Sequence, residues 1–350
     1  MHYPIIIASG KRVDGQGSLE QVAVAEARLR DRKLRLTQLT IDPLAAGWFT
    51  PQAPDHFRSG CAPLEALVAT VELLDSQACD AVVISGQDHI KSGYSKEQRR
   101  HLINVYGAAW HVPLAYTLLA RAFMKRYNLV DADFKRLAER LFANYLRTAR
   151  QQPSFVEPKA TAFTYVTDLY RKVDCANPTI DFDGKLLIGN DQAAVACGIT
   201  TSRHVRILGV AVEKLSGDGP EHVAELAQYR HLQTAWQRLL SMTQLDFPQL
   251  FFDRQAILEA YTCYPVVPLA FLLDCGFADS LGALECVLDN YAITVTGGMN
   301  LAKAPWNNPA LQALIMMHER LSQGQGPYGC VHGNGGLGYK QGAAILQGVI

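Results

Sequence analysis

Short apolar runs and amphipathic stretches alternate along the chain, and this pattern predicts strands and helices that follow one another. The predicted buried strands are continuous apolar runs that end in a glycine or a charged residue, at 3–10, 79–86 and 205–213. The predicted helices have apolar residues at a spacing of three and four, and they lie at 18–31, 62–76 and 221–240. The fold class is therefore α/β.

One long segment, from about 102 to 180, interrupts this alternation. It contains the helical stretch "LLARAFMKRYNLVDADFKRLA", which is rich in basic and aromatic residues. We interpret the segment as a helical excursion from the sheet, which we call the loop domain.

Two segments far apart in the sequence share one pattern. Residues 61–88 and 307–336 each begin a helix at a proline and continue through a polar turn into a short strand that ends in glycine. The apolar runs "PIIIASG" and "RILGVAV" match as opening strands. Amphipathic helices also resemble one another by chance, but we favour an internal duplication. The predicted halves are 1–200, which includes the loop domain, and 201–350.

Charge and composition narrow the function classes. The chain has 350 residues, of which 33 are basic and 33 acidic, so no excess of positive charge attracts nucleic acid or anionic lipid. Its longest apolar stretch, "YPVVPLAFLLDCGF", is interrupted by two prolines and an aspartate, so no membrane span is expected. The eight cysteines form no CxxC pair, which is typical of free thiols in a reducing cytoplasm. We therefore expect a cytoplasmic protein whose partner is a small molecule or a neutral surface.

Three late segments then match a known family in order and spacing. They are "YTCYPVVPLAFLLDCGF", "ITVTGGMNLAKAPWNNP" and "GCVHGNGGLGYKQGA", and "NDQAAVAC" matches the stretch that closes the family's first half. With these motifs the chain resembles the thiolase superfamily, closest to the sterol-carrier-protein-type thiolases and acetyl-CoA acetyltransferases.

The resemblance implies a five-layered αβαβα core built from two duplicated halves, a loop domain over the active site, and a homodimer. It also implies acyl transfer on coenzyme A thioesters in lipid metabolism. Such chemistry needs an activated cysteine, a second acid or base, and an oxyanion hole. No permanently bound cofactor and no metal are expected, because the coenzyme A thioester is the substrate.

The nucleophile is the first catalytic role to place. The thiolase cysteine motif aligns with Gly60 at the cysteine position and with Cys61 one residue later. Cys61 directly precedes a predicted helix, whose N-terminus would lower the pKa of the thiol. We take Cys61 as the candidate nucleophile, and the alternative is a structural thiol packed under the helix.

The family's histidine is missing from its usual place. The turn that carries it aligns with residues 297–305, and Ala304 stands where the imidazole would be. Alanine can neither pair with a thiolate nor donate to an oxyanion.

The glycine-rich stretch "VHGNGGLGYKQGAAIL" at 331–346 superficially resembles a phosphate-binding loop. It lacks the GxxxxGK[ST] spacing and the following helix, so we favour a match to the thiolase C-terminal glycine motif. That match puts His332 where the second catalytic cysteine would be, as a candidate acid or base. It also makes Asn334, Gly335 and Gly336 the candidate oxyanion and substrate-binding group.

Two other cysteines lie in these motifs. Cys330 shares a strand face with His332 and is a second candidate base. Cys263 occupies a position that lines the pocket in the family, although we favour a structural thiol there.

Two functional hypotheses follow. The first, which we favour, is an acyltransferase that acts on acyl coenzyme A with Cys61 as acyl carrier and His332 as acid or base. The second is a catalytically degenerate thiolase-like protein that binds acyl coenzyme A or serves as a subunit of a partner enzyme. Ala304 favours the second hypothesis.

Overall fold

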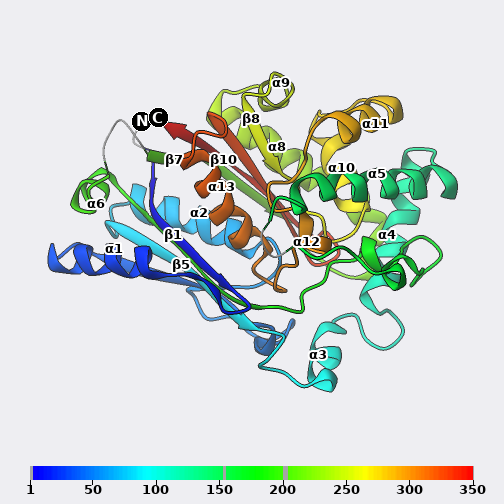
Figure 1. Ribbon diagram of the computed structural model, residues 1–350, viewed down its shortest axis with the longest axis horizontal. Helices are drawn as coiled ribbons and strands as arrows, with labels where there is room; N and C mark the ends of the chain where they lie inside the picture. The colour runs from blue at the N-terminus through cyan, green and yellow to red at the C-terminus, as the bar shows by residue number, and fades with distance from the viewer. Residues whose placement is uncertain (1–2, 153–154, 200–203, 350) are drawn as a thin grey trace.

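A computed structural model describes residues 3–152, 155–199 and 204–349. Its strands form one mixed sheet in the order β4-β3-β5-β6-β1-β7-β10-β9-β8, with β2 paired to β1 (Figure 1). The strand bounds are β1 (Ile5–Val13), β2 (Gln16–Ser18), β3 (Leu36–Ile41), β4 (His56–Phe57), β5 (Ala81–His89), β6 (Asp181–Gly189), β7 (His204–Lys214), β8 (Ala256–Glu259), β9 (Tyr328–Gly335) and β10 (Lys340–Val349).

Thirteen helices accompany the sheet in the described residues. Their bounds are α1 (Glu20–Asp31), α2 (Ala62–Asp75), α3 (Lys96–Ile103), α4 (Val112–Arg126), α5 (Asp131–Ala149), α6 (Asp191–Ala196), α7 (Val223–Leu226), α8 (Arg230–Thr243), α9 (Phe247–Phe252), α10 (Val266–Asp274), α11 (Leu281–Asn290), α12 (Gly298–Leu301) and α13 (Pro309–Ser322). Short 3₁₀ turns are η1 (Leu44–Ala46), η2 (Ala160–Phe163), η3 (Lys172–Asp174) and η4 (Pro220–His222).

The sheet consists of two half-sheets that meet at β1 and β7. These two strands pair only at Ile5 with Arg206 and at Ile6 with Val205. Outward from this joint the order is β1-β6-β5-β3 on one side and β7-β10-β9-β8 on the other. The second strand outward, β6 or β10, is the last strand of its half in the sequence. The third strand outward, β5 or β9, follows a helix with a proline in its first turn, α2 or α13. This matched order agrees with the internal duplication expected from the sequence.

Helices α2 and α13 lie between the two half-sheets (Figure 1). Helix α13 contacts β9, β6 and β1, while α2 contacts β7, β3 and β5. Helices α1 and α6 cover the outer face of the first half-sheet, and α8 covers the outer face of the second. The α/β fold with five layers, predicted above, is therefore confirmed.

The loop domain lies between β5 and β6, and its main helices are α4 and α5, with α3 just before it. Helix α4 contacts α7 and α10, and α5 contacts α11 and α12, so the loop domain covers the C-terminal half (Figure 1). The predicted boundary between the halves, at residues 200 and 201, lies outside the described residues. The division into 1–200 and 201–350 stays a prediction.

The expected helix at 221–240 differs in the structure, because it is divided into η4, α7 and α8. Tyr229 interrupts it with a φ of 50°, a left-handed conformation that an α-helix cannot continue through. The Tyr229 side chain is buried in the C-terminal core, so tertiary packing determines the break.

Candidate functional site

A pocket of about 300 Å³ lies where the loop domain meets the C-terminal half. Its wall is rich in aromatic side chains, namely Trp48, Tyr106, Tyr116, Tyr261, Tyr264 and Trp306. Tyr116 and Tyr264 are stacked with ring centroids 4.0 Å apart, and the two tryptophans meet edge to face at 6.1 Å. A mostly apolar pocket with a few polar groups is the usual form of a small-molecule site.

Gly60 and Ala304, the residues at the thiolase nucleophile and histidine positions, both line this pocket. The Tyr261 phenol oxygen occupies the space that a side chain at position 60 would need. A Cβ placed on Gly60 would overlap that oxygen and would lie 2.5 Å from the Asn334 carbonyl oxygen. The pocket therefore has a tyrosine hydroxyl, and no thiol, at the point where the nucleophile would stand.

Cys61 precedes α2 and is fully buried. Its Sγ lies 3.3 Å from the place where a Cβ on Gly333 would be, so the thiol packs between α2 and β9. Burial raises the pKa of Cys61 well above its ordinary value, and Glu65 adds to the increase while Lys340 opposes it. This direction is opposite to the one we expected from the helix N-terminus. The residue does not line the pocket.

His332 is also buried, and its ring stacks on Phe271 with centroids 4.2 Å apart. The Tyr261 backbone N–H donates to its Nδ1 at 3.2 Å, and its Nε2 donates to Gln341 Oε1 at 2.9 Å. Burial lowers the pKa of His332 to about 4. The imidazole is therefore neutral, with both ring nitrogens hydrogen-bonded inside the protein.

The structure does not bring Cys61 and His332 together. Gly333 lies on the face of β9 that is directed at Cys61. Successive residues of a strand point to opposite faces, so the side chain of His332 lies on the other face of β9. His332 belongs to the apolar cluster around Phe271, whereas Cys61 belongs to the cluster between the half-sheets. An acyltransferase with Cys61 as acyl carrier and His332 as acid or base needs both side chains at one substrate, and this arrangement does not place them so. A catalytic role for either residue stays a prediction.

Asn334 lies on the same face of β9 as His332 and lines the pocket. Its Oδ1 accepts a 2.6 Å hydrogen bond from Gln341 Nε2, and its Nδ2 donates to Tyr116 Oη at 3.2 Å. Gln341 therefore connects His332 to Asn334 and fixes which end of the Asn334 amide is directed to the pocket. His332 does not line the pocket, and this hydrogen-bond connection is its link to the pocket wall.

The two glycines of the predicted oxyanion group lie differently. Gly336 lines the pocket with a φ of 56°, and its carbonyl accepts a 2.6 Å hydrogen bond from Tyr116 Oη. Gly335 does not line the pocket, because a side chain at this position would be directed at Ser59, near the start of α2. Asn334 and Gly336 are thus the two members of the group that the pocket wall contains.

Two thiols, Cys175 and Cys263, line the pocket. Cys263 Sγ donates to Tyr116 Oη at 3.3 Å and lies 4.0 Å from Asn334 Nδ2. Burial raises the pKa of each thiol to about 12, which disfavours thiolate near neutral pH. Cys330 is fully buried and lies outside the pocket wall. All eight cysteines are free thiols, and all lie in the described residues.

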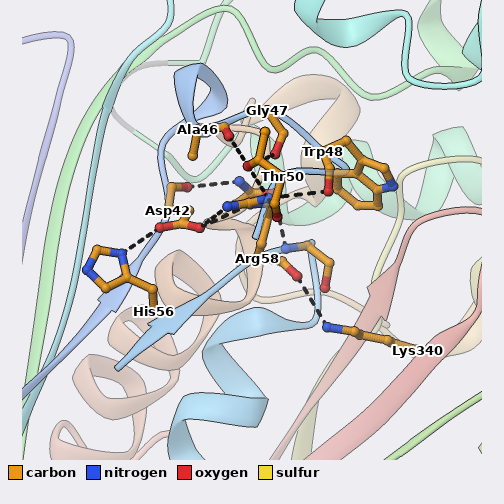
Figure 2. A network of polar contacts seen from close by, with 10 residues as sticks. Asp42, Ala46, Gly47, Trp48, Thr50, His56, Arg58 and Lys340 are labelled. Carbon is orange, nitrogen blue, oxygen red and sulfur yellow. Dashed lines mark hydrogen bonds and ion pairs between the residues drawn. The ribbon is translucent and has the colours of Figure 1, made fainter. Parts of the chain in front are cut away.

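A buried ion pair holds the loop that carries Trp48 (Figure 2). Arg58 Nη2 lies 2.7 Å from Asp42 Oδ2, and both residues are at most 6% exposed. Arg58 Nη1 donates to the carbonyl oxygens of Trp48 at 3.4 Å and Thr50 at 2.8 Å. On the far side of the carboxylate, His56 Nδ1 lies 2.7 Å from Asp42 Oδ1. The guanidinium thus fixes the loop backbone directly beside the pocket.

Sequence reasoning did not identify Trp48, Tyr116, Tyr261 or Asp218 as parts of this region. The only available signal was the "YTCYP" motif, which placed Cys263 at the pocket and has Tyr261 two residues earlier. Trp48 and Asp218 lie in loops with no motif, and they meet only through the tertiary fold.

A larger open groove of about 1130 Å³ lies along β1, the β1–β2 hairpin, α1 and α13. It contains none of the predicted site residues, and its charged side chains have both signs. Within the described ranges, no helix is long and apolar enough to cross a membrane, and no group of three or more His, Cys, Asp or Glu side chains could hold a metal ion.

Comparison with known proteins supports the fold. No protein-family model and no curated protein matches the chain. Among solved structures, the chain is similar to a monomeric SCP2-thiolase like protein type 1 (STLP1) from Mycobacterium smegmatis, with a TM-score of 0.71 and 19% identity over 99% of this chain and 77% of that one. It is also similar to the Ltp2-ChsH2(DUF35) aldolase, with a TM-score of 0.69 and 14% identity over 99% of this chain and 98% of that one.

These similarities, together with the strand order and the layers, show that the chain has a thiolase-like fold. The resemblance found in the sequence is therefore confirmed at the level of the fold. Fold alone does not determine the chemistry of a site.

Proposed function

We propose that this chain binds an acyl coenzyme A thioester in the aromatic pocket without transferring the acyl group to a cysteine. One observation carries the proposal. Gly60 and Ala304 line the pocket at the positions of the thiolase nucleophile and histidine, and the Tyr261 hydroxyl fills the space beside Gly60. Without a thiol and a base at these positions, the usual acyl-enzyme has no groups to form it.

The remaining polar groups of the pocket suit a bound thioester. Asn334 Nδ2 lies in the pocket wall and donates to Tyr116 Oη at 3.2 Å and to the Gly336 carbonyl oxygen at 3.3 Å. The one hydroxyl hydrogen of Tyr116 is donated to the Gly336 carbonyl, so Asn334 Nδ2 is the donor of this group that a ligand could recruit, in place of its long contact with Gly336. A thioester carbonyl oxygen placed near Asn334 Nδ2 would accept from an amide that Gln341 already holds in position, as a donor of an oxyanion hole would be. The aromatic wall would bury the acyl part.

In this proposal the chain is a thiolase-like subunit that holds the thioester for a partner protein. One of its structural neighbours is named as a complex of two components, which supports a partner subunit. The homodimer and the cytoplasmic location expected from the sequence stay predictions.

Calorimetric titration with acetyl coenzyme A tests the binding. The wild-type chain is expected to bind one ligand saturably. Ala304→Leu, which narrows the pocket, is expected to weaken binding, because the larger side chain competes with the ligand for space. Ala132→Leu on the exposed side of α5 is the matched control and is expected to bind like the wild type. No binding by the wild type, or equal binding by Ala304→Leu, contradicts the proposal.

Acyl transfer through Cys263 is the second candidate function. It is favoured by one observation, the position of this thiol in the pocket wall beside Tyr116. The raised pKa of Cys263, about 12, opposes it. Digestion after incubation with radiolabelled acetyl coenzyme A distinguishes the two functions. Hydroxylamine-labile label on a Cys263 peptide, absent from Cys263→Ser, supports acyl transfer, and label on no cysteine supports simple binding.

A further inference from the structure

Asp218 lies behind the pocket, between β7 and η4, and does not itself line the cavity. Its carboxylate is mostly buried and accepts three hydrogen bonds. Leu337 N donates at 2.8 Å, Tyr106 Oη at 3.1 Å and Trp48 Nε1 at 3.3 Å. One side chain thus collects donors from three loops that are far apart in the sequence.

Each of these three loops forms part of the pocket wall. Trp48 comes from the loop that Arg58 holds, Tyr106 comes from the loop domain, and Gly336 comes from the turn between β9 and β10. The glycine turn packs directly on the carboxylate, because a Cβ on Gly336 would overlap the oxygens of Asp218. Asp218 therefore contacts all three of these parts of the pocket wall.

We propose that Asp218 is a positioning residue that joins three walls of the pocket and holds the Trp48 indole in place at the ligand site. Regulation of ligand binding by Asp218 rests on the proposed function of this pocket. It does not require the ligand to be acyl coenzyme A.

The chemistry of the three donors explains why a carboxylate is needed. An ionised carboxylate only accepts hydrogen bonds, and all of its partners here donate. When it is protonated, the Tyr106 hydroxyl can reverse and accept the new proton, but an indole N–H and a backbone N–H can only donate. The Trp48 contact is the longest of the three, so it is the one expected to loosen first.

This change falls in a measurable range of pH. Burial raises the pKa of Asp218 to about 6, with a smaller contribution from the charge of Glu221, while the three hydrogen bonds act in the opposite direction. The titratable groups around it are Tyr106, Tyr339 and Glu221. The two tyrosines have raised pKa values, so both are neutral near pH 6.

Separate residues hold the backbone and the side chain of Trp48, so the change is limited to the indole. Arg58 holds the backbone of the Trp48 loop through the Trp48 and Thr50 carbonyls, and this contact does not involve Asp218 (Figure 2). Loss of the Asp218 contact therefore frees the indole while the loop backbone keeps its position. The expected response is a local rearrangement at the pocket mouth rather than unfolding.

Fluorine NMR of the full chain labelled with 5-fluorotryptophan tests the inference without any ligand. The chain has four tryptophans, and the Trp48 resonance is identified by its absence from Trp48→Phe. The wild-type Trp48 resonance is expected to move with a midpoint near pH 6. In Asp218→Asn it is expected to stay constant with pH, and the exposed-site control Asp279→Asn is expected to behave like the wild type.

Affinity for acetyl coenzyme A is measured separately. It is expected to fall about 5-fold or more between pH 7.5 and pH 5 in the wild type and to change little in Asp218→Asn. A Trp48 resonance that does not titrate, or that titrates equally in Asp218→Asn, overturns the inference. If no ligand binds at any pH while the resonance titrates as expected, the proposed function fails and the role of Asp218 stands.

Discussion

Replacement of Gln341 by leucine is expected to disconnect His332 from Asn334. Gln341 is 1% exposed, accepts from His332 Nε2 at 2.9 Å and donates to Asn334 Oδ1 at 2.6 Å. Leucine has a similar size but no polar group, so it leaves one buried donor and one buried acceptor without a partner. Each such group costs about 1–3 kcal/mol, and the expected loss of stability for the two is therefore about 2–6 kcal/mol.

Gln341→Glu tests the orientation of the Asn334 amide separately from the stability of the fold. A glutamate can still accept from His332, but it has no N–H for Asn334 Oδ1. The Asn334 amide is then expected to turn over, so that its Nδ2 meets the carboxylate and its Oδ1 is directed to the pocket. A ligand carbonyl would meet an acceptor instead of a donor, and affinity for acetyl coenzyme A should fall at least about 10-fold.

Urea unfolding and calorimetric titration measure the two effects. Gln52→Leu, at an exposed position, is the matched control and should change neither quantity. The reasoning is refuted if Gln341→Leu costs less than about 0.5 kcal/mol, the size of an ordinary surface substitution. It is equally refuted if Gln341→Glu binds the ligand like the wild type.

Three further predictions follow from buried groups of the same region. Gly60→Ala should destabilise the chain by about 1–3 kcal/mol in a urea titration, because the added methyl overlaps the Tyr261 hydroxyl. Removal of that hydroxyl by Tyr261→Phe should restore part of the lost stability. Equal stability of the wild type and Gly60→Ala would contradict the geometry. Asp218 has a folded-state pKa of about 6, above its ordinary value of 3.8, so the folded protein binds this proton more tightly than the unfolded chain does. The stability of the wild type relative to Asp218→Asn should therefore decrease by up to about 3 kcal/mol as the pH rises from 4 to 7. An increase in relative stability would contradict the assignment. The His332 imidazole should titrate near pH 4 in NMR, because burial lowers its pKa, and a value at or above 6.5 would show that the ring is not enclosed as described.

Much of the fold could be predicted from the sequence, because its elements have local signals. The apolar runs at β1, β5 and β7 are long enough to indicate buried strands, and Pro63 and Pro309 mark the starts of α2 and α13. The matched pattern of the two halves then indicates the same strand order in each. The break at Tyr229 could not be predicted, because it depends on where that ring packs in the folded protein.

The site was only partly predictable, for a reason that β9 makes clear. The motifs placed Gly60, Ala304 and Asn334 at the pocket, and all three line it. They did not show which face of β9 is turned to α2, and this face decides that Cys61 and His332 lie apart. The motif aligns Gly60 with the nucleophile position, and Gly60, not Cys61, lies in the pocket wall.

The contacts of Trp48 with Arg58 and Asp218 have no sequence signal at all. They join loops separated by up to 170 positions, and each loop lacks a periodic pattern. Only the folded chain brings the three residues together.

The central claim, that the pocket holds an acyl thioester without forming an acyl-cysteine, is tested most directly by the intact mass of the protein after incubation with saturating acetyl coenzyme A. The account predicts the unmodified mass at a ligand concentration at which titration shows full occupancy. A mass increase of one acetyl group per chain, absent from Cys263→Ser or from Cys61→Ser, would contradict it.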